Sequence, residues 1–100
     1  MNAKFNELIN QDHLVLVDFY ADWCGPCKMM SPILQETKTA VKDDVKIIKI
    51  NVDQHQDLAS EFMVRGVPTF LLFKKGKMLW RQSGVLSKTQ LIEIINQHKN

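Results

Sequence analysis

Cys24 and Cys27, separated by two residues, are the only cysteines in the sequence of 100 residues. A thiolate can attack a disulfide to form a mixed disulfide, which a second nearby thiol then breaks within the same molecule. The pair joins an apolar run to a predicted helix, where free N–H groups, the positive end of the helix dipole and Lys28 favour a thiolate at the first cysteine. We therefore predict dithiol/disulfide exchange, with Cys24 as the nucleophile and Cys27 as the resolving thiol.

The residues beside the two cysteines suit a substrate that approaches the sulfur closely. Pro26 fits the first helical turn, where its missing N–H has no helical partner. Gly25 has no side chain to obstruct another polypeptide, and Trp23 supplies a flat apolar wall. We expect these three residues to contact the substrate.

A Cys-x-x-Cys pair is also typical of half a zinc site. Such a site needs two further ligands, but His13, His55 and His98 are isolated in the sequence and there is no second cysteine pair. A structural pair of buried thiols is disfavoured too, because a turn between strand and helix usually reaches the surface. We expect no metal.

Asp18 is the single polar residue within the apolar run 14–20. Burial in such a strand raises the pKa of a carboxyl group, which would make Asp18 a proton acceptor for Cys27 during the second step. The alternative is a buried aspartate held by local hydrogen bonds without a catalytic part. Burial alone does not decide between the two.

Hydrophobic periodicity predicts the elements that position these residues. Pro32 should kink the long second helix without ending it, Gly66 is placed to end the third, and Ser87 with Gln90 forms a capping box for the last. A parallel unit followed by an antiparallel hairpin predicts an α/β fold, in which helices flank a mixed sheet of about four strands. The predicted helices are 3–10, 26–42, a short one around 58–63 and one after Ser87; the predicted strands are 14–20, 45–52, 69–73 and 78–82.

Composition places further bounds on the function. One hundred residues with 45% hydrophobic and 24% charged residues predict one globular domain, 1–100. The net charge of +2 is spread along the chain and gives no electrostatic case for nucleic acid. The longest apolar run, 14–17, is too short to cross a membrane, and the first residues do not resemble a secretory signal, so we expect a cytoplasmic protein.

The hexapeptide Trp23–Lys28 resembles the active-site motif of the thioredoxin family, and the resemblance extends over nearly the whole chain. It implies the thioredoxin-like fold, with Asp18 as the buried carboxylate, Lys49 as its charged neighbour, and a cis bond before Pro68 that faces the sulfurs. It also implies that Val67 offers backbone hydrogen bonds to an extended substrate and that Gly84 lies beside the site. The other matching segments are Val17–Ala21, Pro32–Leu34 and Gly66–Thr69.

The family resemblance implies a general protein disulfide reductase whose redox-active disulfide, Cys24–Cys27, is its only redox group. Its partners would be disulfide-bearing client proteins and a thioredoxin reductase, which uses NADPH to recharge it. Two other hypotheses are a binding module whose thiols are incidental and a dedicated reductant of one enzyme.

The sequence departs from the family pattern in three places. The family's short edge strand ahead of the first helix is missing, which would leave the strand 45–52 at a sheet edge and allow an otherwise monomeric protein to self-associate there. Tyr20 replaces a common tryptophan, and Ser83 stands where an apolar residue usually borders the docking surface. Both substitutions would affect partner preference.

Overall fold

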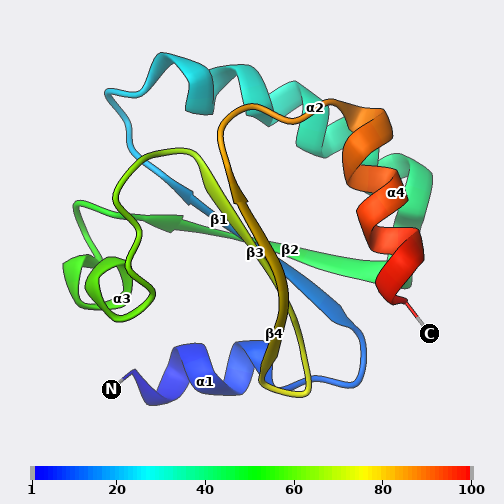
Figure 1. Cartoon of the computed structure of the whole chain (residues 1–100), viewed down its shortest axis with the longest axis horizontal. Helices are drawn as coiled ribbons and strands as arrows, with labels where there is room; N and C mark the ends of the chain where they lie inside the picture. The colour runs from blue at the N-terminus through cyan, green and yellow to red at the C-terminus, as the bar shows by residue number, and fades with distance from the viewer. Residues whose placement is uncertain (1, 100) are drawn as a thin grey trace.

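The computed structural model describes residues 2–99, which form a four-stranded sheet with helices on both faces (Figure 1). The sheet order is β2-β1-β3-β4, with β1 parallel to β2 and antiparallel to β3, and β3 antiparallel to β4. The predicted α/β fold with a mixed sheet is therefore confirmed. In chain order, the elements are α1 (Ala3–Ile9), β1 (Leu14–Tyr20), α2 (Gly25–Val41), a short 3-10 turn η1 (Lys42–Asp44), β2 (Val45–Asn51), α3 (Gln56–Glu61), β3 (Thr69–Lys74), β4 (Lys77–Ser83) and α4 (Lys88–His98).

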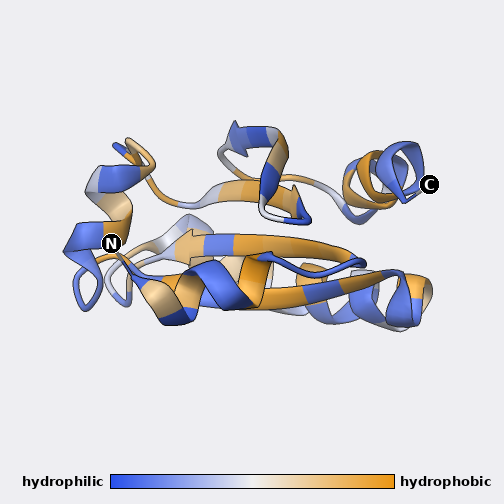
Figure 2. Ribbon diagram, turned by 90° about the horizontal axis from the view of Figure 1, so that it is seen from below, coloured by the Kyte–Doolittle hydropathy of each residue, from blue (hydrophilic) through white to orange (hydrophobic). Residues whose placement is uncertain are grey.

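The central strand β1 divides the core in two because its side chains alternate between the faces of the sheet. Leu14 and Leu16 pack with α2 and α4, whereas Val15 and Val17 pack with α1 and α3. Figure 2 shows the central strands mostly in the hydrophobic colour and the helices in mixed colours, as expected of amphipathic helices that each bury one face. Asp18 follows the Leu14 and Leu16 alternation, so it lies on the α2 side.

The structure confirms that Pro32 does not end the second helix and that Ser87 caps the last one. Pro32 lies inside α2, which continues to Val41. Ser87 caps α4, with its side chain accepting from the Gln90 N–H while the Gln90 side chain accepts from the Ser87 N–H. Both ends of the reciprocal pair satisfy N–H groups that the first turn of a helix leaves free.

The predicted end of the third helix is wrong. α3 ends at Glu61, and the chain turns at Phe62 and Met63, where the Met63 φ is 53° and its N–H donates to the Ser60 carbonyl at 3.1 Å. Gly66 lies three residues farther on, in the loop before β3. The apolar side chains at 62 and 63 extend the helical periodicity in the sequence, but they belong to the turn that closes the helix.

Strand β2 lies at one edge of the sheet, as predicted, and β4 lies at the other. Within residues 2–99, no strand precedes α1. Over the same range, every helix is too short or too polar to pass through a bilayer.

Candidate redox site

The two cysteines lie at the N-terminal end of α2, shortly after the end of β1. Cys24 is the N-cap residue of α2, with extended backbone, and its Sγ accepts a hydrogen bond from the Cys27 N–H at 3.1 Å. The Cys24 carbonyl accepts from the Lys28 N–H at 3.3 Å, and Pro26 occupies the first turn. The helix N-terminus thus directs N–H groups and the positive end of its dipole at the sulfur of Cys24.

Cys24 and Cys27 form a disulfide, with their Cα atoms 5.3 Å apart. The two residues are only 4% and 5% exposed, whereas the neighbouring Trp23 is 71% exposed. The Trp23 side chain is therefore exposed to solvent beside a disulfide that is almost fully buried. Among residues 2–99, no group of three or more His, Cys, Asp or Glu residues is arranged to hold a metal ion.

The loop before β3 faces the disulfide. The Val67–Pro68 peptide bond is cis, and the Val67 carbonyl oxygen lies 3.6 Å from the Cys24 Sγ. The Pro68 carbonyl accepts from the Gly84 N–H at 2.9 Å, and the φ of +98° at Gly84 is a conformation that glycine adopts without strain. Fold and loop thus bring together Cys24, Val67, Pro68 and Gly84, which lie far apart in the sequence.

Trp23 forms one wall of a small hollow on this surface. The hollow, of about 110 Å³, is also lined by Val52 and by residues 64–67 of the loop before β3. The Trp23 indole N–H donates to the Asp53 carboxylate at 2.9 Å, which fixes the direction of the exposed ring. Sequence reasoning missed Asp53, because nothing local marks a single aspartate after a strand as the partner of a residue thirty positions earlier.

Asp18 is 1% exposed, and within the described residues its Oδ1 atom has no hydrogen-bond partner. Burial raises the pKa of the Asp18 carboxyl to about 6, and the positive charge of Lys49 opposes that rise. The alternative interpretation requires local hydrogen bonds that hold the Asp18 carboxyl group. Its Oδ1 atom has none among the described residues, which disfavours that interpretation. A carboxyl group with this pKa exchanges its proton near neutral pH.

Lys49 lies beside Asp18 in the parallel register of β1 and β2. Its ammonium group lies 4.8 Å from the centre of the Tyr20 ring and donates to the Ser31 Oγ at 3.5 Å. A hollow of about 170 Å³ is lined by Cys27 together with Tyr20, Ser31 and Lys49. Cys27 and Lys49 thus border the same recess, and the aromatic ring of Tyr20 gives the lysine a favourable cation–π partner.

Comparisons with known proteins agree with this arrangement. The thioredoxin family model matches residues 1–97. The thioredoxin of Haemophilus influenzae is 48% identical over 97% of this chain and 92% of its own length. The chain belongs to the thioredoxin family. Thioredoxin Y2 of Arabidopsis thaliana, a chloroplastic protein, is 46% identical over 92% of this chain and 56% of its own length. Mitochondrial thioredoxin 3 of Saccharomyces cerevisiae, in its oxidized form, superposes with a TM-score of 0.85 at 40% identity, covering 94% of this chain and 87% of that one.

Membership of the thioredoxin family makes the chain a protein disulfide reductase with a redox-active cysteine pair. The Cys24–Cys27 disulfide is the oxidised form of that pair. The family works with thioredoxin reductase and with disulfide-bearing client proteins.

One of the residues that depart from the family pattern also joins the site's packing. Ser83 ends β4, where its Oγ lies 2.8 Å from the Oγ1 of Thr69, the residue after Pro68. This pair ties the end of β4 to the loop that faces the disulfide. The hydroxyl of Ser83 thus has a hydrogen-bonding partner in the residue that follows Pro68, which an apolar side chain at position 83 would lack.

Proposed function

We propose that Cys24, as a thiolate, attacks one sulfur of a client disulfide. A bond then forms between Cys24 and that sulfur, while the other client sulfur leaves as a thiolate and takes a proton. The N-cap position of Cys24 supports this role, because the Cys27 N–H donates to its Sγ at 3.1 Å and the helix dipole stabilises negative charge there.

The second step uses Cys27 and Asp18. Cys27 loses its proton to Asp18 and attacks the Cys24 sulfur; the bond from Cys24 to the client breaks, and the second client sulfur leaves as a thiolate that takes a proton. The client gains two electrons, and the chain is left with the Cys24–Cys27 disulfide. The unpartnered Oδ1 of Asp18 and its pKa of about 6 are the observations that carry this assignment. Lys49 modulates Asp18, since its charge opposes the rise in pKa.

Clients bind on the surface around the sulfurs. Trp23, Gly25 and Pro26 are exposed beside Cys24, and Val67 with Pro68 faces it across the site. An extended client segment would pair with the Val67 backbone as an added strand, while Gly84 leaves room beside it.

The whole chain acts as one domain, in which strands β1 and β2 carry Asp18 and Lys49, the start of α2 carries the two cysteines, and the loop before β3 carries Val67 and Pro68. A thioredoxin reductase that uses NADPH recharges the disulfide, and no cofactor is bound. Bacterial relatives such as that of Haemophilus influenzae support the cytoplasm as its place of action, although the chloroplastic relative shows that the family also serves organelles.

Insulin reduction coupled to NADPH oxidation by thioredoxin reductase tests this function. The chain should turn over, Cys24→Ser should abolish turnover, and Cys27→Ser should accumulate a mixed disulfide with insulin that gel electrophoresis without reductant detects. Lys77→Ala, at the start of the distant edge strand β4, serves as a matched surface control. If the double Cys24→Ser, Cys27→Ser variant keeps its biological activity, the chain is a binding module instead.

A further inference from the structure

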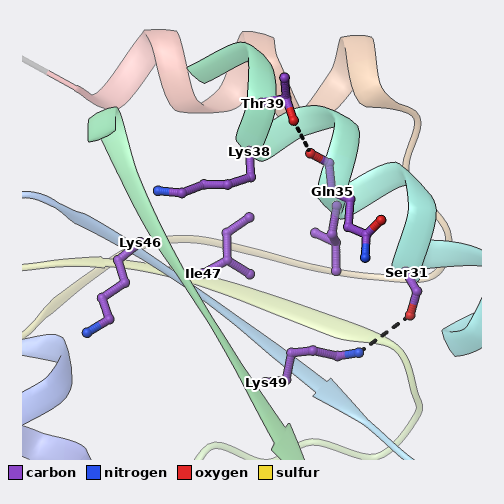
Figure 3. Close-up of a pocket in the computed structure, with 8 residues that line it drawn as sticks. Ser31, Gln35, Lys38, Thr39, Lys46, Ile47 and Lys49 are labelled. Atoms are coloured by element: carbon purple, nitrogen blue, oxygen red, sulfur yellow. Dashed lines mark hydrogen bonds between the residues drawn. The ribbon is translucent and has the colours of Figure 1, made fainter. Parts of the chain in front are cut away.

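A groove of about 600 Å³ lies between α2 and the edge strand β2, and its lining comes from these two elements alone (Figure 3). Leu34 and Ile47 give it an apolar floor, and Gln35 adds an amide at its rim. The groove is separate from the surface around Trp23 and Pro68, although Lys49 at one end borders the recess beside Cys27.

The backbone of β2 presents free hydrogen-bonding groups to this side. The Val52 N–H donates to the Tyr20 carbonyl at 2.9 Å, so the even-numbered residues of β2 direct their N–H and C=O groups at β1. Successive residues of a strand alternate in this direction, so Val45, Ile47 and Lys49 face away from β1. Lys38 satisfies the Val45 carbonyl at 2.6 Å. The N–H and C=O groups of Ile47 and Lys49 remain available to a further strand.

The charges that line the groove determine which kind of added strand can bind there. Lys38, Lys46 and Lys49 line it, and none of its described lining residues is acidic. A second copy of this chain that paired through β2 would bring the same lysines against one another, and like charges across neighbouring strands are destabilising. A segment with carboxylates would instead complement them.

We propose that the free edge of β2 and its groove bind an extended acidic segment of a partner polypeptide as an added strand. The backbone of Ile47 and Lys49 would supply the hydrogen bonds, Leu34 and Ile47 would contact alternate apolar side chains, and the lysines would meet the carboxylates. This binding does not depend on the redox reaction. It would place a partner beside the recess of Cys27.

A synthetic peptide tests the proposal directly. The probe is acetylated and amidated, has the length of β2 (7 residues) and alternates glutamate with valine. Titration into the full chain, with its disulfide intact, is followed by amide NMR shifts, which should concentrate in β2 and the facing side of α2. The same peptide with lysine for glutamate should not bind. Equal binding of both peptides, or no binding of either up to millimolar concentration, overturns the proposal.

Two pairs of variants separate the roles of charge and backbone. Lys46→Glu should weaken binding by about fivefold, whereas Lys77→Glu, with the same change of net charge on the opposite edge strand, should not. Ile47→Pro should weaken binding by about tenfold relative to Ile47→Ala, because both lose the side chain but only proline lacks the outward N–H. Equal affinities within both pairs would show that the peptide does not add to β2.

A second measurement covers the case in which Ile47→Pro fails to fold. Methylation of alternate peptide nitrogens in the acidic probe blocks strand pairing and keeps its charge, so the methylated probe should lose binding to the unaltered chain. Undiminished binding of that probe overturns strand addition. Sedimentation equilibrium of the chain alone should give a monomer; a dimer that Ile47→Pro abolishes but Ile47→Ala preserves would assign the groove to a second copy and overturn the acidic partner.

Discussion

Asp18 in β1 and Asn51 at the end of β2 are both buried polar residues of neighbouring strands, but only Asn51 has its hydrogen bonds satisfied. The Asn51 Oδ1 accepts from the Asp53 N–H at 2.9 Å and from the Gln54 N–H at 3.3 Å. Its Nδ2 donates to the Asp22 carboxylate at 3.4 Å. The Oδ1 of Asp18 has no partner in the described part of the chain.

This difference separates a residue that shapes the fold from one that weakens it. The Asn51 side chain accepts hydrogen bonds from two backbone N–H groups of the turn after β2. Asp18 is desolvated without a hydrogen bond to its Oδ1, and the charge of Lys49 offsets only part of the cost of keeping its carboxyl group charged. A polar group kept in the core at that cost, on the side of the sheet that packs against the helix of Cys27, is the arrangement expected of a proton acceptor.

The largest effect should come from removing the carboxylate. Asp18→Asn keeps the shape of the side chain but cannot accept a proton, so the rate of mixed-disulfide resolution at pH 7 should fall by about 10²-fold. Rapid quenching of insulin reduction measures that rate. Because the ionised carboxylate is the active form and its pKa is about 6, the wild-type rate should fall as the pH drops below 6, whereas the variant should show no such fall. Similar rates for the two proteins at pH 7 would remove Asp18 from the reaction.

The same substitution should stabilise the protein. Burial raises the pKa of Asp18 to about 6, so the folded state binds the proton more tightly than the unfolded state. The contribution of Asp18 to the free energy of unfolding is therefore most favourable below the unfolded pKa and is lost as the pH rises through 6. Asp18→Asn should be more stable by about 2–3 kcal/mol at pH 7, with little difference near pH 4. Urea unfolding at both values measures this; a variant less stable at pH 7 would contradict the desolvation argument.

Removing the polar side chain of Asn51 should have the opposite effect on stability. Asn51→Ala removes the acceptor of two backbone N–H groups in a residue that is 5% exposed, so the free energy of unfolding should fall by about 2 kcal/mol. Urea unfolding should show the same loss at pH 4 and pH 7, since no titrating group is removed. Asp53→Asn, which keeps the turn but alters the partner of Trp23, is the matched control for local disturbance.

The sequence predicted the environment of Asp18 better than that of Asn51. The apolar run around Asp18 gave both its burial and its shifted pKa, because a strand buried on both faces leaves a carboxyl group little access to water. Asn51 could not be assigned in this way. Its partners at 53 and 54 are local, but only the folded turn shows which of several nearby polar groups bond to one another.

The remaining parts of the site depended on long-range contacts. The approach of Val67 to Cys24 and the bond of Gly84 to Pro68 follow from the order of strands in the sheet, which periodicity does not specify. Family resemblance predicted that this loop faces the sulfurs and that Gly84 lies beside the site, along with the role of Lys49, but it did not predict these individual contacts. It could not supply the bond between Trp23 and Asp53, because sequence patterns alone give no signal for an indole N–H that reaches across thirty positions.

The smallest effect should come from Thr37, a third buried polar residue, which lies within α2. Its hydroxyl donates to the Ile33 carbonyl at 2.7 Å, one turn earlier in the same helix. Thr37→Val removes that donor, but α2 continues past Thr37 to Val41 and the main chain of the helix keeps its own hydrogen bonds; the change in stability should be at most about 1 kcal/mol, without pH dependence. A loss as large as that of Asn51→Ala would show that a satisfied hydroxyl in the core matters for more than its own hydrogen bond. A small change would show that a buried hydroxyl bonded within its own helix matters less to stability than the amide of Asn51 or the unpaired carboxyl group of Asp18.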